Sequence, residues 1–260
     1  ELIAGGYLQR FSIFAFFTLP FFYKKKFDNF SKFIYPALFL IFILAIILSG
    51  NRMHLILFLF AVFLIMLFEK KNRKSFFYFF LSFTIIFVII FNLNSSVKTN
   101  FRGFYKQVSG MVIVLFNKDS KQKQSIAYLN EFSTFYETWL FNKYIGGGIK
   151  NFRYFCHTRS VKKEIVPKSK MVCNMHPHNY YLEILTETGI IGFITAISFI
   201  LITLYISLYQ KYFTDNPLKK NVLIVPFLFL FIAEIFPIKS TGSFFTTGNT
   251  TYIFLIMALL

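Results

Sequence analysis

The stretch HPHNYYLEILTETGIIGFITAISFILITLYISLYQ, residues 176–210, decides the fold, because it joins a polar cluster to an apolar run that is long enough to cross a bilayer. Two imidazoles and an amide, from His176, His178 and Asn179, stand where the long polar segment 94–178 enters that run. Titratable groups are costly to keep where water meets bilayer, so the sequence predicts a functional site there. The alternative is an interfacial histidine that helps to cap a helix and does no chemistry.

The composition predicts the class of protein. Hydrophobic residues make up 56% of the 260 residues, 40 of them are Phe, and the mean hydropathy is +0.58. That is too apolar for a soluble domain of this length. Charged residues, 15% of the total, cluster between long apolar runs, as is typical of a polytopic membrane protein. Because the sequence opens on Glu1 and stops inside an apolar run at Leu260, we expect it to be part of a longer protein.

The apolar runs predict an all-α fold, a bundle of about seven transmembrane helices forming one domain over residues 1–260. The loop 94–178 belongs to this domain, and its residues 125–144 have the periodicity of an amphipathic helix. The predicted spans are residues 4–22, 33–49, 53–68, 75–93, 180–210, 221–238 and 250–260.

Basic residues in the short loops set the predicted orientation. They gather in alternate loops, whereas the short hairpins on the opposite side carry only Arg52 and Lys239. Because Lys and Arg favour the cytoplasmic side, the alternate loops are predicted to be cytoplasmic and the loop 94–178 to face outward. The cytoplasmic set is Lys24, Lys25, Lys26, Lys32, Lys70, Lys71, Arg73, Lys74, Lys211, Lys219 and Lys220.

The outward loop is strongly basic. It holds 14 of the 28 Lys and Arg residues against four acids. One interpretation is a polyanionic partner such as phosphate, pyrophosphate or an acidic glycan. The other is compositional, since an excess of Phe, Ile, Lys and Asn is typical of an AT-rich coding sequence. Nucleic acid is not expected as a partner, because the basic surface faces outward and carries no known nucleic-acid module.

Both cysteines, Cys156 and Cys173, lie in this loop. In an exported loop the natural expectation is a disulfide that closes a ring of about 17 residues and contributes roughly 3 kcal/mol. The competing hypothesis is a zinc site, since Cys156-His157 and Cys173-x-x-His176 resemble half of one. We expect the disulfide and no metal.

Four further charged residues are candidates for function. Arg52 follows a tight turn, and its planar fork of donors suits a phosphate, although a lone Arg at a helix start also reaches lipid headgroups. Glu187 lies four residues after Glu183 on one helical face, so a cation, either Arg52 or a loop residue, is expected opposite them. Glu234 is more isolated. Lys239 lies in the hydroxyl- and glycine-rich segment 236–249, which lines a pocket or forms an ordinary polar turn.

These motifs resemble those of the O-antigen ligase and O-antigen polymerase superfamily, in the order in which that family has them. The central one is His178-Asn179 followed after nine residues by Gly189-Ile-Ile-Gly192. The others are Ser49-Gly-Asn-Arg52, Gly146-Gly-Gly-Ile-Lys-Asn-Phe152-Arg153, Glu1-Leu-Ile-Ala-Gly-Gly-Tyr7 and Phe236-Pro-Ile-Lys-Ser-Thr-Gly-Ser-Phe244. The chain departs from the family in lacking the helices expected before Glu1 and the basic residue expected just before the amphipathic helix.

The resemblance implies glycosyl transfer at the periplasmic face of the bacterial inner membrane. The donor would be an undecaprenyl-pyrophosphate-linked glycan. The acceptor would be a lipid A-core sugar in a ligase, which we expect, or another lipid-linked glycan in a polymerase. Both use the same signature, so the sequence does not separate them. Rival classes are a lipid-linked glycan transporter and a non-catalytic membrane scaffold, and a scaffold would not need the outward His and Arg together.

The chemistry assigns roles to named residues. His178 is the expected catalytic base, because it precedes the N-cap Asn179 and a helix N-terminus favours neutral imidazole. Arg52 is expected to bind the pyrophosphate, with Arg102 or Arg153 as the second arginine. No Asp-x-Asp pair occurs in the outer loops, so we expect a reaction without a metal or other cofactor. The resemblance implies an inverting glycosyltransferase. The remaining expected substrate-binding residues are Asn179, Glu187 and Lys239.

Overall fold

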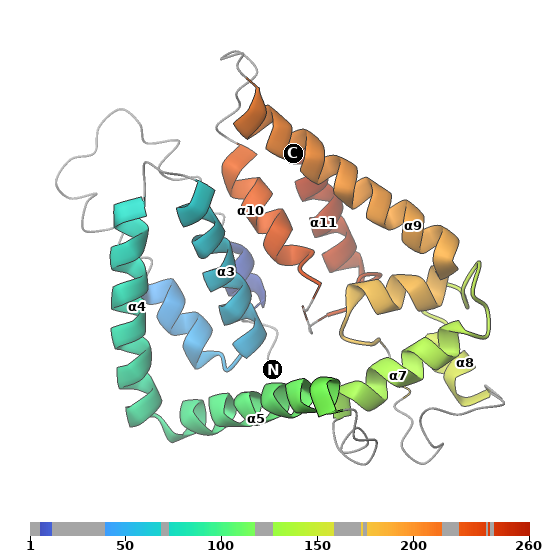
Figure 1. The fold of residues 1–260 in the computed structure, drawn as a ribbon, viewed down its shortest axis with the longest axis horizontal. Helices are drawn as coiled ribbons and strands as arrows, with labels where there is room; N and C mark the ends of the chain where they lie inside the picture. Colours follow the sequence, from blue (N-terminus) through green and yellow to red (C-terminus); the bar gives the residue numbers. More distant parts are fainter. Residues whose placement is uncertain are drawn as a thin grey trace. The chain divides into compact units, whose positions relative to one another are not determined.

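The computed structural model describes residues 6–11, 40–68, 73–117, 127–158, 173, 176–214, 224–237, 239 and 242–260. Every regular element within these ranges is a helix, in agreement with the predicted all-α class (Figure 1). The chain divides into two compact units. Unit 1 comprises Glu1–Phe104, Leu204–Phe236 and Ile256–Leu260, and unit 2 comprises Tyr105–Thr203 and Pro237–Leu255.

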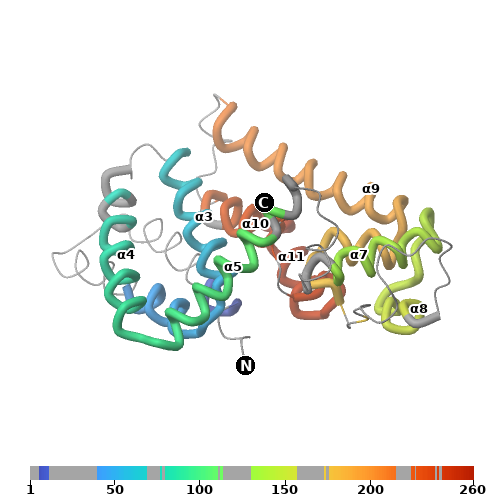
Figure 2. The backbone as a smooth tube through the Cα atoms, turned by 60° about the horizontal axis from the view of Figure 1, so that its bottom comes forward, coloured from blue at the N-terminus to red at the C-terminus, as the bar shows by residue number. Residues whose placement is uncertain are grey.

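Helix α3 (Arg52–Phe68) is the centre of unit 1. It lies between α4 (Arg73–Leu93) and α10 (Ile224–Glu234) and packs against both (Figures 1 and 2). Its sequence is apolar around nearly the whole circumference, as is typical of a helix with neighbours on several sides. Phe58 and Ala61 are completely buried in this core.

One ion pair crosses the core of unit 1. The Arg10 guanidinium donates to both carboxylate oxygens of Glu234, with Nη2 2.5 Å from Oε1 and Nε 3.3 Å from Oε2. Glu234 is completely buried, so the pair satisfies a carboxylate that would otherwise be costly to bury. The expectation that Glu234 is isolated is therefore wrong.

Unit 2 contains α7 (Ala127–Trp139), α8 (Phe152–Thr158) and the first part of α9 (Tyr180–Leu208). Helices α7 and α8 lie side by side (Figure 2). The Phe135 and Phe152 rings stack at 3.4 Å between centroids beside a disulfide. That bond joins Cys156 and Cys173, with an S–S distance of 1.96 Å. The rest of unit 2 includes most of α11 (Thr247–Leu259).

The predicted amphipathic helix at residues 125–144 is present as α7, but it ends earlier, at Trp139. Residues 125 and 126 lie outside the described part of the chain. After Trp139 the backbone forms a series of turns that leads into Gly146. Of the apolar residues of α7, Phe135 is fully buried, whereas its neighbour Tyr136 is 43% exposed.

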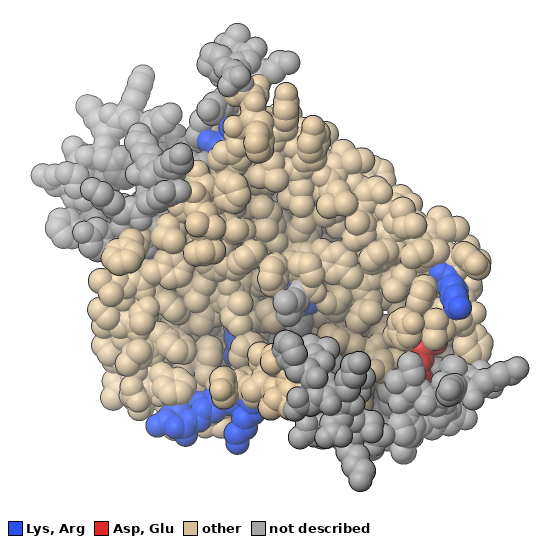
Figure 3. All heavy atoms as spheres, viewed as in Figure 1, with Lys and Arg blue, Asp and Glu red and all other residues tan. Residues whose placement is uncertain are grey.

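Helix α5 (Ser95–Asn117) was not predicted from the sequence. Asn94 caps it, since its Oδ1 accepts from the Val97 N–H at 3.1 Å. The helix carries Lys98, Arg102 and Lys106 at four-residue intervals, which places them on one face. Figure 3 shows basic side chains gathered along the lower edge, where α5 begins.

One described helix is long and apolar enough to cross a membrane on its own. It is Tyr180–Phe213, where α9 runs into the π-helical η3 (Tyr209–Phe213), and its most apolar stretch of 18 residues has a mean hydropathy of 2.3. Phe80–Leu93 and Ser95–Gly110 pass this test only as a pair, bent by 107°. The long helix agrees with the predicted span 180–210.

The predicted number of about seven spans is not confirmed. The apolar helices α3 and α11 are shorter than a full span. Most of the predicted span 4–22 and the first part of span 33–49 lie outside the described residues. The same holds for most of the basic residues that were used to predict orientation, including Lys24–Lys26, Lys70, Lys71, Lys219 and Lys220.

Candidate active site

The polar start of α9 is fixed by Asn179, which is the helix N-cap, as predicted. Its Oδ1 accepts from the backbone N–H groups of Tyr181 at 3.0 Å and Leu182 at 3.1 Å. Its Nδ2 donates to the Pro237 carbonyl at 2.8 Å. One side chain thus satisfies the helix end and ties it to the segment that precedes α11.

His178, directly before the cap, has a left-handed backbone with φ 50°. Few residues other than glycine adopt this conformation, and where it persists it often marks a functional site. Its ring lies 4.5 Å from that of His176 in an edge-on arrangement at 75°. Neither imidazole nitrogen of His178 has a hydrogen-bond partner among the described residues.

The two imidazoles influence each other. Burial lowers the pKa of His176 below its usual value of 6.5, and the neighbouring His178 lowers it further. Both effects disfavour the charged form of His176. A neutral His176 places no positive charge beside His178.

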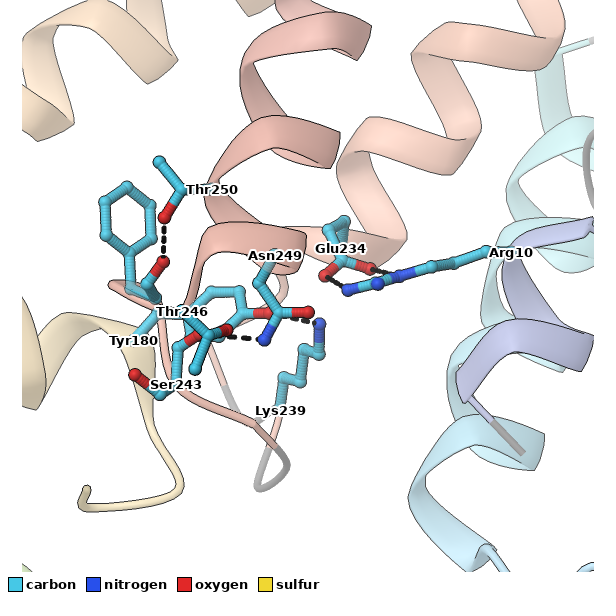
Figure 4. A network of polar contacts seen from close by, with 9 residues as sticks. Arg10, Tyr180, Glu234, Lys239, Ser243, Thr246, Asn249 and Thr250 are labelled. Carbon is cyan, nitrogen blue, oxygen red and sulfur yellow. Dashed lines mark hydrogen bonds and ion pairs between the residues drawn. The ribbon is translucent and has the colours of Figure 1, made fainter. Parts of the chain in front are cut away.

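The Lys239 side chain is buried against the first residue of α9. Its Nζ donates to the Tyr180 hydroxyl oxygen at 2.8 Å and lies 4.4 Å from the centroid of that ring (Figure 4). Lys239 is only 4% exposed. The ammonium therefore anchors segment 239–250 to α9 by a hydrogen bond and a cation–π contact.

Glu183, one turn into α9, makes a second anchor to the same segment. The Ser243 hydroxyl donates to Glu183 Oε1, and the Phe244 backbone N–H donates to Oε2 at 2.5 Å. All of these groups are buried, with Glu183 only 1% exposed. Both carboxylate oxygens are thus satisfied inside the protein.

Residues 242–250 are ordered by their own hydrogen bonds (Figure 4). Asn249 Nδ2 donates to the Ser243 carbonyl at 2.8 Å, and Thr250 Oγ1 donates to the Phe244 carbonyl at 2.5 Å. Gly242 has φ 78°, and a Cβ there would lie 2.8 Å from Asn249 Nδ2. The segment is therefore a defined turn against the start of α9 and not a loose connection.

The glycine motifs meet in a backbone joint. Gly189 has φ 67° and ψ −170°, which breaks α9. The unpaired backbone groups on either side are taken by the chain after α7. Ile190 N–H donates to Lys143 O at 2.8 Å, and Gly147 N–H donates to Thr186 O at 3.0 Å. A Cβ on Gly146 would overlap the backbone of α9, and a Cβ on Gly189 would overlap the backbone of the chain after α7. The two segments can therefore make this contact only if both positions are glycine.

Glu187 belongs to this joint. Its Oε2 accepts from the Lys150 backbone N–H at 2.7 Å, and its carbonyl accepts from Gly148 N–H at 2.9 Å. The Lys150 ammonium also acts electrostatically on Glu187 and on Glu183. The cation expected opposite these carboxylates is therefore a loop residue, Lys150.

The candidate arginines differ in setting. Arg52 begins α3 after a tight turn in which Gly50 has φ 71° and Ser49 Oγ donates to Ile46 O at 2.7 Å. Arg102 is exposed on α5, and Arg153 is exposed on α8 with its guanidinium 5.0 Å from the Tyr154 ring centroid. Arg52 and Arg102 belong to unit 1, whereas Arg153 belongs to unit 2 with His178.

The start of α9 is thus a small polar site. The structure gathers four of the expected residues, His178, Asn179, Glu187 and Lys239, on α9 or on segments bonded to it. Sequence reasoning missed Tyr180 and the pairing of Glu183 with segment 239–250. The available signal was a carboxylate near the start of an apolar helix, together with the hydroxyl-rich segment 236–249.

Comparison with known proteins agrees with this arrangement. The model of the O-antigen ligase family matches residues 37–197, which include the Arg52 turn, the glycine joint and the start of α9. Neither the curated proteins nor the solved structures contain a match to the chain. The family is one of bacterial inner-membrane proteins that act as ligases or polymerases in lipopolysaccharide biosynthesis, on lipid-linked glycans. Since the match covers more than half of the sequence, the chain belongs to the O-antigen ligase family.

Proposed function

We propose that this protein is an O-antigen ligase. It transfers a glycan from undecaprenyl pyrophosphate to a hydroxyl of the lipid A-core at the periplasmic face of the inner membrane. The family supports the class of reaction. The observation that carries the residue assignment is the left-handed backbone of His178 directly before a capped helix N-terminus, with its ring against His176 and no hydrogen bond from that ring to another described residue.

The reaction is a direct displacement at the anomeric carbon. The acceptor oxygen forms a bond to that carbon while the bond from carbon to the pyrophosphate oxygen breaks, so the configuration inverts. The acceptor proton goes to an imidazole nitrogen of His178, which acts as general base. The electron pair leaves with undecaprenyl pyrophosphate.

The leaving pyrophosphate gains negative charge, which arginines and N–H groups stabilise without a metal ion. Arg52 supplies a planar fork for this purpose, with Arg102 or Arg153 as the second cation. The N–H groups at the start of α9 add to the positive potential there.

Asn179, Glu187 and Lys239 contribute to the site by holding other segments of the chain in place. Their polar groups are engaged with protein atoms: the Asn179 amide with the Pro237 carbonyl, Glu187 with the Lys150 N–H, and Lys239 with the Tyr180 hydroxyl. These contacts hold segment 239–250 and the contact between the two glycine motifs in a fixed position relative to His178. Substrate binding depends on them through this arrangement.

Deletion of the parent gene tests the function. Free lipid A-core together with full-length polymer on the carrier lipid is the expected result. Single repeat units on the carrier would instead identify a polymerase, and unchanged surface polysaccharide would reject both activities.

Complementation then tests the base. His178→Ala should transfer about two to four orders of magnitude more slowly with purified donor and acceptor, because an acid–base group is lost. His176→Ala is the matched control and should lose much less. Both proteins should insert and form the disulfide. A fully active His178→Ala protein would remove the proposed base.

A further inference from the structure

Unit 2 contains a cavity of 160 Å³ that is separate from the polar groups at the start of α9. It lies where the end of α7, the glycine segment, α8 and α9 meet. Its side chains are three aromatic rings and three neutral polar groups, from Phe141, Phe152, Phe155, Thr138, Asn142 and Thr186. No charged side chain is among the described residues that line it.

Two of the three aromatic rings that line the cavity are exposed. Phe152 is buried and forms the floor, whereas Phe141 and Phe155 are 57% and 41% exposed at the rim. The Phe155 ring lies over the backbone of Gly147, where a Cβ would come within 2.8 Å of it. Exposed aromatic rings over a small cavity are costly to leave in water, and they favour an apolar ligand face.

The polar side chains that line the cavity indicate which class of ligand fits it. A carboxamide and two hydroxyls donate and accept hydrogen bonds without adding charge. The Thr186 hydroxyl, which donates to the Phe135 carbonyl at 3.4 Å, keeps its lone pairs for a ligand donor. A pyrophosphate would need cations here, and an acyl chain would make no use of the Asn142 carboxamide or of the hydroxyl lone pairs. A pyranose ring suits both features, because C–H groups occupy its faces and hydroxyls its edge.

We propose that this cavity is a binding site for one neutral sugar ring of the glycan substrate. The inference rests on the proposed glycosyl transfer. Thr186 lies roughly 9 Å along the helix axis from Tyr180, at about 1.5 Å per residue. The cavity therefore holds a ring away from the reacting bond and contributes to recognition of the glycan, not to the chemical step.

Direct binding is the test. The full-length protein in nanodiscs is titrated with core and O-antigen oligosaccharide released by mild acid from the lipopolysaccharide of the same bacterium. Calorimetry and saturation-transfer NMR measure the affinity and the contacting protons. Phe141→Ala and Asn142→Ala should each weaken binding about tenfold, as loss of a main contact does. Tyr144→Ala is the matched control, because Tyr144 is 71% exposed nearby and does not line the cavity.

Transfer kinetics separate this inference from the proposed function. Phe141→Ala and Asn142→Ala should raise KM and leave kcat nearly unchanged, whereas His178→Ala should bind oligosaccharide normally and fail to transfer. Normal binding by both cavity variants, or saturation transfer from lipid acyl chains in place of sugar protons, would overturn the cavity assignment while transfer persists. Oligosaccharide binding without transfer by the wild type would instead reject the proposed function.

Discussion

The Glu183 carboxylate accepts the backbone N–H of Phe244 at 2.5 Å, so one buried side chain on α9 fixes the backbone that leads into α11. The Ser243 hydroxyl occupies the other carboxylate oxygen. Because neither donor faces solvent, each depends on Glu183 for its hydrogen bond.

Glu183→Ala should therefore destabilise the protein. It leaves a buried N–H and a buried hydroxyl without their acceptor, at a cost of about 1–3 kcal/mol for each group. Glu183→Gln is the control, since its carbonyl can accept the Phe244 N–H and its amide can donate to the Ser243 oxygen. Thermal unfolding in detergent should rank wild type and Gln well above Ala. Equal Tm values would mean that the two hydrogen bonds contribute nothing net.

Gly189→Ala should disrupt the joint between α9 and the glycine segment. Its φ of 67° with ψ −170° is essentially restricted to glycine, and an added Cβ would overlap the Tyr144 carbonyl. We expect a loss of roughly 3 kcal/mol or more, from backbone strain and steric overlap together. Gly248→Ala is the matched control, because a Cβ there meets nothing within 4 Å. Proteolysis and thermal unfolding compare the two, and similar stability would contradict the assigned role of Gly189.

His176 makes the site sensitive to acid. Its pKa is lowered by burial and by His178, so the unfolded protein binds more protons than the native protein below about pH 6.5. Stability should therefore fall as the pH drops through this window, and transfer should fall with it as positive charge appears beside His178. His176→Gln should shift the acid limb of the kcat/KM profile to lower pH. An unchanged profile would show that His176 does not titrate in this range.

Arg52→Lys should remain strongly impaired if the guanidinium binds the pyrophosphate through two N–H groups, because lysine keeps the charge but loses the planar fork. Arg52 begins α3 just after the Gly50 turn, and its side chain contacts no described residue through a hydrogen bond or ion pair. Substitution should therefore leave folding intact. Donor affinity and transfer rate are the measurements. Near-normal transfer by Arg52→Ala would show that Arg52 contacts lipid headgroups and does not bind the pyrophosphate.

The Cys156–Cys173 bond should appear as one linked peptide pair in non-reducing mass spectrometry. It closes a separation of 17 residues beside the Phe135–Phe152 stack. Reduction, or Cys156→Ser with Cys173→Ser, should cost roughly 3 kcal/mol of stability in the chain-entropy model. Two free thiols in the purified protein, or stoichiometric zinc, would contradict this prediction.

The sequence predicted features that depend on local pattern. The helix from Tyr180 and the Asn179 cap follow from an apolar run and from a side chain that suits the cap position. Helix α5 was missed because its lysines and arginine made the segment look like a polar loop, although their four-residue spacing is helical.

Features that depend on contacts distant in sequence were not predictable in the same way. Gly146 and Gly189 were noted separately, and only the folded chain shows that each accommodates the backbone of the other's segment. Lys239 was expected to bind substrate, but its long apolar stem allows it to be buried with its ammonium on Tyr180. Periodicity and residue type do not specify such partners.

The break in α9 at Gly189 has a consequence for how the protein tolerates its lipid environment. Bilayers differ in hydrocarbon thickness, and a helix that crosses them adapts by changing its tilt. In an uninterrupted helix that tilt would also move the first turn. Here the ladder of hydrogen bonds is interrupted, and Asn179 and Glu183 are held by segment 239–250. The residues on both sides of Gly189 are bonded to the segment after α7, since Ile190 N–H donates to Lys143 O and Gly147 N–H donates to Thr186 O. A change of tilt would therefore reach the histidine end through this extramembrane segment and not along one continuous helix.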